Sequence, residues 1–363
     1  MRYAIIGTGS MGKKYAAMLN GGDVKDAVLT AVVCRSESNK EWARANLSQS
    51  VRVHDSADEL YDNPDEYDTV LIVTPHKSHP ELAIKAFAIG KNVFCDKPAG
   101  VSVKQAASMN AAARSAGKLY GMMFHQRLYE KYIAIKEILD AGKLGEVKRV
   151  MLVNSRFYRT RFYHDSSEWR SSWTGEGGGA LINQGQHIID IWIWLFGMPE
   201  SIYANIPFGK YNDFDVDDEA TLLMTYKNKM SAVFMLTTGE AVWEERLEII
   251  GTKGSILLED DDMTMSLYED VVEYGQKAIV NSREQLNVTL DARKFPHSKE
   301  PYVNMLDNFT HSMSENDLIA PGSAGYNALQ ITNAAYLSAW KEEKVNLPIE
   351  EDEYEMELNK HMV

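Results

Sequence analysis

A glycine-rich hexapeptide near the N-terminus has the spacing of a phosphate-binding turn. The sequence GTGSMG directly follows the apolar segment YAII and precedes a stretch with helical spacing. In such a turn the first glycine permits a tight bend, the second lets the backbone approach a pyrophosphate, and the third allows close packing of helix on strand. A glycine-rich turn without a ligand is the alternative. We expect a dinucleotide site at Gly7, Thr8, Gly9, Ser10, Met11 and Gly12.

The end of the second expected strand bears on the choice between NAD and NADP. An NAD site usually has Asp or Glu at this point, bonded to the ribose 2′-hydroxyl. Here the chain reads Cys34-Arg35-Ser36 and has no acid before Glu37. An arginine and a hydroxyl suit a 2′-phosphate better than a carboxylate would, so NADP is favoured. Arg35 as a solvated loop cation is the alternative.

The segment KNVFCDKPAG (91–100) contains a lysine that could take part in chemistry. A short apolar strand ends here in an acid, Lys97 and a proline. A lysine in such a place can be an ordinary solvated charge. It can also be a proton-transfer group at the mouth of a cleft. The segment alone leaves both interpretations open.

A second group of polar side chains lies in ALINQGQHIIDIWIW (180–194). Asn183 and His187 are four residues apart, so they share one face of an otherwise apolar helix, and Asp190 follows beside His187. The glycines at 177–179, just before this helix, allow close approach of the backbone to a ligand or to another segment. A helix histidine is often a satisfied core residue, and spacing alone does not decide between core and catalysis.

These residues need a scaffold, and the first third of the chain alternates apolar strands with helices. Strand patterns at YAIIG, VLTAVVCR, TVLIVTP, NVFCDKP and LYGMMF are separated by helical patterns. One helix opens with Ser102 and Gln105 at the spacing of a capping box. Apolar strands separated by helices indicate a parallel sheet covered on both sides, which is a doubly wound α/β fold. We expect this dinucleotide-binding domain to span residues 1–125.

The pattern changes after about residue 125. A helix (YEKYIAIKEILDAGKLG) and a long strand (EVKRVMLVNSRFY) precede a loop rich in Arg, Tyr and Trp at 156–176. Alternating segments such as DEATLLMTYKN and MSAVFMLTTGE follow, joined by a hairpin loop. The sequence therefore predicts a second, α+β domain at 126–363, with a large, mostly antiparallel open sheet and a C-terminal helix that can pack back on the first domain.

Composition argues against several classes of function. The chain has 363 residues, which suits two domains, and a formal net charge of −14. This charge argues against binding nucleic acid or an anionic membrane surface, and no apolar run approaches the ~20 residues of a membrane span. Cys34 and Cys95 fit neither a disulfide framework nor a metal site, and the N-terminus enters a strand at once. We expect a cytoplasmic protein without a bound metal.

Four motifs in register resemble the Gfo/Idh/MocA family of oxidoreductases. They are GTGSMG at the N-terminus, CDKPAG at 95–100, GGGALINQGQHIID at 177–190 and LEIIGTKGSI at 247–256. The resemblance extends over nearly the whole chain and implies a Rossmann domain joined to a C-terminal domain whose open sheet mediates homodimers or homotetramers. It also implies an NAD(P)-dependent enzyme that moves a hydride between nicotinamide and a carbon of a sugar, sugar derivative or cyclitol.

The resemblance assigns roles to the catalytic candidates. Lys97 matches the lysine of the family's (E/D)KP motif, which handles the proton of the substrate hydroxyl beside the nicotinamide; burial and neighbouring cations can lower a lysine pKa for this task. Asp96 stands where the family usually has glutamate. His187 matches a histidine that hydrogen-bonds the reacting oxygen or relays its proton. Asn183 stands where aspartate is frequent, and an amide cannot accept a proton at neutral pH, so Lys97 should carry the acid–base work with His187 assisting.

Further site residues follow from the same resemblance. Beyond the glycine turn and the second strand tip, the cofactor candidates are Thr74, Pro75, His76, His79, Asp96, Lys97, Gln126, Trp169 and Arg170. The substrate candidates are Arg127, Arg156, Tyr158, Tyr163, Asn183 and His187. Several lie on the loop at 156–176, whose aromatic and polar side chains suit a carbohydrate or polyol; a solvated surface loop is the alternative.

Two other functions are compatible with this resemblance. Some relatives oxidise a sugar transiently, which allows elimination of a glycosidic substituent and regenerates the cofactor in each cycle. One relative is a transcriptional regulator that keeps the fold as a cofactor-sensing partner, and the presence of Lys97 and His187 argues against that use here.

Overall fold

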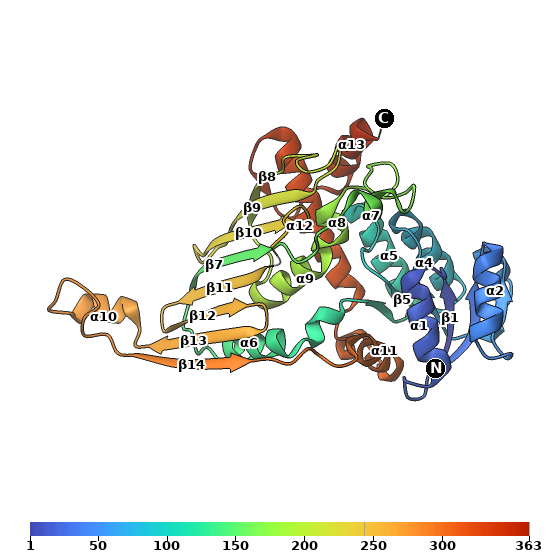
Figure 1. Ribbon diagram of the computed structural model, residues 1–363, viewed down its shortest axis with the longest axis horizontal. Coiled ribbons are helices and arrows are strands. Elements are labelled where there is room, and N and C mark those ends of the chain that lie inside the picture. The colour runs from blue at the N-terminus through green and yellow to red at the C-terminus, as the bar shows by residue number, and fades with distance from the viewer. Residues whose placement is uncertain (243, 363) are drawn as a thin grey trace.

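Two β-sheets lie side by side, with one long helix between them (Figure 1). The computed structural model describes residues 1–242 and 244–362. The first sheet has six strands and the second has nine. Among the described residues, no helix combines the length and the apolar character needed to span a membrane.

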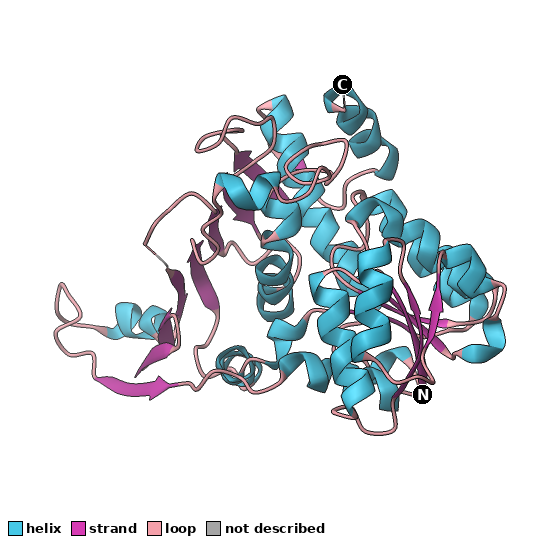
Figure 2. Ribbon diagram, turned by 45° about the vertical axis from the view of Figure 1, so that its right-hand side comes forward, coloured by secondary structure: helices cyan, strands magenta, loops and turns pink. Residues whose placement is uncertain are grey.

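The six-stranded sheet comes from the N-terminal part of the chain. Its strands are β1 (Arg2–Ile6), β2 (Val28–Val33), β3 (Arg52–His54), β4 (Thr69–Ile72), β5 (Asn92–Cys95) and β6 (Tyr120–Met122), and its helices are α1 (Ser10–Gly21), α2 (Glu37–Asn46), α3 (Ala57–Tyr61), α4 (His79–Ala88) and α5 (Val103–Ala116). The order is β3-β2-β1-β4-β5-β6 and every pair is parallel. Figure 2 shows helices on both sides of this sheet, and β4 is buried along its whole length. The expected doubly wound fold is confirmed.

Local signals define the ends of these helices. Ser36 and Ser102 are the N-cap residues of α2 and α5, and each side chain accepts a hydrogen bond from the backbone N–H three residues further on. Helix α5 ends at Gly117, which has a left-handed backbone with φ of 60°. The expected capping box is only half formed, because Gln105 Oε1 accepts from the N–H of Val101 and not from that of Ser102.

The nine-stranded sheet is built almost entirely from antiparallel pairs. Its strands are β7 (Val147–Asn154), β8 (Ser201–Asn205), β9 (Glu219–Thr225), β10 (Ser231–Thr237), β11 (Glu245–Gly251), β12 (Gly254–Glu259), β13 (Asp262–Tyr268), β14 (Val288–Lys294) and β15 (Val345–Asn346). The order is β14-β13-β12-β11-β7-β10-β9-β8-β15, and only β7 and β10 pair in parallel. Burial alternates along β7 and β11, so one face of the sheet is covered and the other is more open. The expected mostly antiparallel sheet and the β9–β10 hairpin are both confirmed.

The remaining helices cover the large sheet and join it to the first one. They are α6 (Glu130–Asp140), α7 (Arg161–Asp165), α8 (Ala180–Asn183), α9 (Gly185–Phe196), α10 (Val271–Lys277), α11 (Pro301–His311), α12 (Gly322–Lys341) and α13 (Glu351–His361). The central helix α12 bonds to both sides: Asn333 Nδ2 donates to Val101 O at 3.1 Å, and Ser338 Oγ accepts from the N–H of Ala204 in β8 at 2.9 Å. These bonds connect α12 to the loop before α5 on one side and to the large sheet on the other.

Candidate functional site

A large cleft lies at the carboxyl ends of β1, β2, β4 and β5, where nucleotides bind in open α/β sheets. Its volume is about 780 Å³. Residues of the segment 163–183 close its other side, so both parts of the chain contribute walls. The size and position of this cleft fit a small-molecule cofactor.

The glycine turn after β1 forms one wall of the cleft. Gly7 has φ of 102°, and a Cβ there would lie 2.5 Å from Val73 O. A Cβ at Gly12 would lie 1.8 Å from Gly7 O, so glycine is needed for α1 to start this close to the turn. At Gly9 a Cβ would meet nothing within 4 Å. The open space at Gly9, together with the N–H groups that begin α1, fits a pyrophosphate.

The end of β2 forms a second wall. Arg35 and Ser36 line the cleft and are exposed, whereas Cys34 is buried behind them. Ser36 Oγ also accepts the N-cap hydrogen bond of α2 from the N–H of Asn39 at 3.3 Å. The described residues that line this end of the cleft carry no carboxylate.

The loops after β4 and β5 are tied together behind the cleft. Thr74 and Pro75 line it directly. The ring nitrogens of His79 lie 2.7 Å from Thr74 O and 2.8 Å from Pro98 O, so this residue supports the wall from behind and does not line it. The Lys97–Pro98 peptide bond, next to this contact, is cis.

Side chains from the opposite side meet the loop after β4 at His76. The Nδ1 of His76 donates to Glu176 O at 3.1 Å, and the ring lies edge-on to Trp169 with 5.1 Å between the ring centroids. The guanidinium of Arg170 lies over the rings of Trp169 and Tyr163, 4.6 Å and 4.4 Å from their centroids. Together these residues close the cleft over the expected nicotinamide end.

Lys97 lies at the base of the cleft, directly after β5. Its Nζ donates to two atoms of Asn183 at the end of α8, the backbone O at 2.7 Å and Oδ1 at 3.0 Å. Burial lowers the pKa of Lys97; the charge of Arg170 acts in the same direction, and the carboxylates of Asp96 and Glu176 oppose it. The structure therefore brings Lys97 and Asn183 into contact, and Lys97 is no ordinary solvated charge.

Asp96 is a buried carboxyl beside Lys97. Its Oδ1 accepts from the N–H of Lys97 at 2.8 Å, and its Oδ2 accepts from the hydroxyl of Tyr15 at 3.3 Å. Burial raises the pKa of Asp96, and the charge of Lys97 opposes that rise. The carboxyl thus holds the backbone at the start of the Lys97–Pro98 turn.

Glu176 is a site residue that the sequence analysis missed. Its residue exposure is only 3%, and its Oε1 and Oε2 accept from Asn183 Nδ2 at 2.5 Å and from the N–H of Ser171 at 2.7 Å. Burial raises the pKa of Glu176 to about 7, although the bond from Ser171 and the charges of Arg170 and Lys97 oppose this shift. The one feature in the sequence that could have pointed to Glu176 is its position as an acid immediately before the glycines at 177–179.

His187 lies one turn after Asn183, as its spacing predicted. Burial lowers its pKa well below the usual value, and nearby His125 and Lys97 act in the same direction, so the imidazole is neutral. The rings of His187 and His125 lie edge-to-face with centroids 4.6 Å apart. Within the described residues, His187 Nδ1 has no hydrogen-bond partner. His125 could not be predicted as part of this group, because nothing in its spacing connects it to this helix.

The glycine run at 177–179 packs against protein. A Cβ at these three positions would lie 2.5 Å from Val101 Cγ1, 2.4 Å from the hydroxyl of Tyr336 and 2.0 Å from Asp217 O. The carboxylate of Asp217 accepts from the N–H of Gly179 at 2.8 Å and from the N–H of Leu181 at 2.7 Å. Of the two interpretations of the run, close approach to another segment is therefore the one observed, and it fixes the start of α8.

Arg127, expected at the substrate, is engaged elsewhere. Its Nε and Nη2 donate to the buried carboxylate of Asp190 at 2.8 Å and 2.7 Å, and its Nη1 donates to Ile319 O at 2.7 Å. Asp190, expected beside His187, is thus the partner of Arg127. Gln126 is buried in the same turn and is not among the residues that line the cleft.

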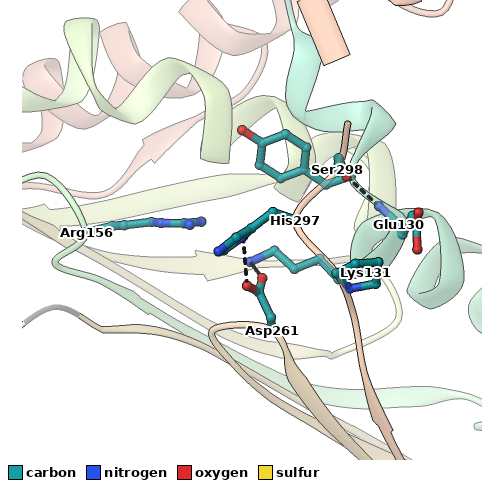
Figure 3. Close-up of a pocket in the computed structure, with 8 residues that line it drawn as sticks. Glu130, Lys131, Arg156, Asp261, His297 and Ser298 are labelled. Carbon is teal, nitrogen blue, oxygen red and sulfur yellow. Dashed lines mark hydrogen bonds and ion pairs between the residues drawn. The ribbon is translucent and has the colours of Figure 1, made fainter. Parts of the chain in front are cut away.

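Arg156, a second substrate candidate, lines a separate pocket of about 90 Å³ (Figure 3). Glu245 accepts from Arg156 Nη1 at 2.9 Å and from Lys131 Nζ at 2.5 Å. In Figure 3, Lys131 and His297 both approach Asp261, at 3.3 Å and 3.2 Å. This network is built from α6, β11, the residues after β7, the turn between β12 and β13, and the segment before α11, and it ends at the exposed ring of His297.

The structure gathers most of the expected cofactor residues around one cleft. Those that line it are Gly7, Thr8, Gly9, Ser10, Met11, Arg35, Ser36, Thr74, Pro75, His76, Asp96, Lys97, Trp169 and Arg170, with Tyr163 and Asn183 of the substrate set. Expected residues that do not line it are Gly12, Cys34, His79, Gln126, Arg127, Arg156, Tyr158 and His187; of these, Tyr158 is 54% exposed.

Family models match two segments of the chain. A model described as an oxidoreductase family with an NAD-binding Rossmann fold matches residues 1–124. A model described as a GFO/IDH/MocA C-terminal domain matches residues 132–257. The two matches follow the two sheets.

Individual proteins are also similar to this chain. Trans-1,2-dihydrobenzene-1,2-diol dehydrogenase of Bos taurus is 26% identical over 264 residues, which is 72% of this chain and 74% of that protein. Inositol 2-dehydrogenase of Rhizobium meliloti is 23% identical over 356 residues, which is 96% of this chain and 99% of that protein. The crystal structure of the WlbA dehydrogenase from Bordetella pertussis, in complex with NADH and UDP-GlcNAcA, has a TM-score of 0.78 at 22% identity and covers 96% of this chain and 99% of that one. This last likeness concerns the fold.

Proposed function

Because the chain belongs to the Gfo/Idh/MocA oxidoreductases, we propose that it transfers a hydride between NAD(P) and a secondary alcohol or ketone of a sugar, sugar derivative or cyclitol. The similar proteins include an inositol dehydrogenase and a dihydrodiol dehydrogenase, and the Bordetella complex contains NADH and UDP-GlcNAcA. These names support a substrate with hydroxyl groups on a ring.

The observation that carries this proposal is the buried lysine at the base of the cleft. Lys97 Nζ is held by both oxygens of Asn183, and burial lowers the pKa of Lys97. A lowered pKa leaves more of a lysine as the neutral amine at a given pH, and the neutral amine is the form that accepts a proton. A nicotinamide bound in the cleft supplies the acceptor or donor of the hydride. Lys97 takes the hydroxyl proton during oxidation and returns it during reduction.

Two further groups can bind the reacting oxygen. The hydroxyl oxygen of Tyr163 accepts hydrogen bonds from the side-chain N–H groups of three residues, Arg170 at 2.7 Å, Gln184 at 3.1 Å and Asn183 at 3.3 Å. Because these three groups only donate, the Tyr163 hydroxyl proton is left to donate to a ligand in the cleft. His187 does not itself line the cleft, but it lies one turn beyond Asn183, and its neutral ring can donate one hydrogen bond and accept another. We assign both to orienting the substrate, with proton transfer left to Lys97.

A thermal-shift experiment tests the proposal at the level of binding. A ligand that binds only the native state raises the melting temperature with its occupancy. Either NAD or NADP, added alone, should raise the melting temperature. A sugar or cyclitol should raise it further when the cofactor is present. If neither cofactor changes the melting temperature at millimolar concentration, the proposal is wrong.

We propose that the preferred cofactor is NADP. Arg35 and Ser36 line the cleft at the end of β2, and the described lining residues there carry no carboxylate that would bond a ribose 2′-hydroxyl or repel a 2′-phosphate.

Ser36→Asp should shift this preference toward NAD by at least ~10-fold in the ratio of kcat/KM values, because like charges in contact cost several kcal/mol. Aspartate can keep the N-cap bond that Ser36 makes to α2, so the helix should be preserved. Steady-state kinetics with both cofactors measure the ratio, and Ser48→Asp, an exposed position after α2, controls for the added charge. An unchanged ratio in Ser36→Asp would mean that this strand end does not contact the ribose.

We also propose that the chain forms a homodimer or homotetramer through the open face of its large sheet. Tyr203 in β8 and Leu223 in β9 are 44% and 50% exposed although they lie in regular strands, and exposed apolar residues in a sheet favour association. Leu223→Lys should shift the mass measured by light scattering toward the monomer. A wild-type protein that is monomeric at micromolar concentration would contradict this proposal.

A further inference from the structure

The amide of Asn183 stands between a buried cation and a buried carboxyl. Lys97 Nζ donates to Asn183 Oδ1 at 3.0 Å, and Asn183 Nδ2 donates to Glu176 Oε1 at 2.5 Å. An ammonium group only donates and an amide nitrogen cannot accept, so this orientation of the amide is the one that satisfies both neighbours. The three groups form a continuous line from the base of the cleft into the protein.

We propose that Glu176 is a positioning residue that acts through Asn183: it holds the amide against Lys97 and adds, to the charge of Asp96, a second negative charge that favours the protonated form of Lys97. This inference rests on the proposed role of Lys97 in proton transfer. Position 183 itself carries no charge, so the counter-charges for the lysine come from two neighbouring carboxyls, Asp96 and, to a smaller extent, Glu176. Glu176 stands at the far end of the same hydrogen-bonded line.

The surroundings of Glu176 keep its carboxyl in place and away from water. The N–H of Ser171 donates to its Oε2 at 2.7 Å, and the carboxyl faces an enclosed space of about 10 Å³, shared with Asn183, which is too small for a ligand. The charged and titratable groups around Glu176 and Lys97 are Arg159, Arg170, His76, His79, His125, His164, His187, Asp96 and Asp217. His76 and His164 are neutral because burial lowers the pKa of each.

The charge of Glu176 acts on Lys97 in a defined direction. It raises the pKa of Lys97, whereas burial lowers it. In the direction of alcohol oxidation the neutral amine of Lys97 accepts the proton, so kcat/KM rises with pH through the pKa of Lys97. Removing the charge at 176 should therefore move this rise to lower pH, and adding a charge at 183 should move it to higher pH.

The test is the pH profile of kcat/KM for the wild type and four variants. Glu176→Gln should shift the rise downward by about one pH unit, and Asn183→Asp should shift it upward by about as much. The double variant Glu176→Gln/Asn183→Asp moves the charge from one residue to the other and should return the profile toward that of the wild type. Glu168→Gln, an exposed carboxylate on the same loop, should leave the profile unchanged.

Stability against pH gives a readout that needs no substrate. Burial raises the pKa of Glu176 above its unfolded value, so its contribution to stability is complete below about pH 4.5 and is lost as pH rises through about 7. The melting temperature of Glu176→Gln relative to the wild type should therefore increase by a few degrees between about pH 5 and pH 8, and that of Glu168→Gln should not.

Several results would overturn the inference. One is a pH profile of Glu176→Gln that coincides with those of the wild type and Glu168→Gln. Another is a double variant whose decrease in kcat/KM equals the sum of the two single-variant decreases in free-energy terms, because additivity marks the carboxyl as structural. If Glu176→Gln does not fold, Asn183→Asp still tests the inference. An unshifted pH profile of kcat/KM in that variant would show that a charge at position 183 does not act on Lys97. Absence of any turnover by the wild type would instead refute the proposed function, and the melting curves would still test the buried carboxyl.

Discussion

Lys97→Met is expected to lower kcat by at least ~10²-fold, the usual cost of removing a general acid–base group. Methionine keeps the length and the apolar stem of the lysine, so the packing between the end of β5 and α8 should survive. The lost atom is the Nζ that contacts both oxygens of Asn183 at the base of the cleft. Steady-state kinetics give kcat, and cofactor fluorescence quenching gives the binding constant, which should change by less than ~3-fold.

Lys118→Met is the matched control for this substitution. Lys118 is exposed before β6 and does not line the cleft, so the same chemical change there should leave kcat within ~2-fold of the wild type. If Lys97→Met turns over at a near-normal rate, the assignment of proton transfer to this lysine is wrong. A loss of cofactor binding equal to the loss of kcat would assign Lys97 to binding.

Asp190→Ala is expected to lower the free energy of unfolding by about 3–5 kcal/mol, because it leaves a largely buried arginine without its counter-charge. The side chains of Asp190 and Arg127 are 1% and 10% exposed, and Arg127 also donates to Ile319 O, which links the turn after β6 to the segment before α12. Denaturant unfolding followed by fluorescence measures the change. Glu273→Ala, which removes one partner of an exposed pair with Lys277, should change the stability by less than ~0.5 kcal/mol.

Asp190→Ala also distinguishes a structural role of Arg127 from a role in substrate binding. If Arg127 is a structural partner of Asp190, the stability falls and the KM for substrate changes little in the protein that remains folded. If Arg127 binds substrate, as the sequence resemblance implies, removing Asp190 leaves the Arg127 side chain without its orienting partner. KM should then rise while the free energy of unfolding hardly changes. The second outcome would contradict the structural assignment.

The sequence predicted the fold where its signals are local and periodic. The glycine turn after β1 and the fully apolar β4 identify a parallel sheet without tertiary information. Strand β3 and helix α3 were missed because three and five residues are too few to show a period. The helix expected across the second polar group is divided at Gln184 into α8 and α9, yet Gln184 keeps helical dihedral angles, so Asn183 and His187 remain one turn apart.

The candidate site was less predictable because its partners lie far apart in the chain. Lys97 and Asn183 are 86 residues apart, and only the resemblance to a family suggested that they share a site. The acid at 176 and the histidine at 125 acquire their properties from burial, which no local pattern specifies. Arg127 was expected at the substrate because a sequence shows a charge but not its partner, and here the partner is Asp190.

The most direct test of the central claim is the absorbance of reduced nicotinamide when the purified protein meets NAD or NADP together with a panel of sugars and cyclitols. We expect that at least one pair produces reduced cofactor with the wild-type protein, and that Lys97→Met produces it at least ~10²-fold more slowly. A protein that binds a cofactor but reduces it with no member of the panel, or a Lys97→Met variant as fast as the wild type, would contradict the account.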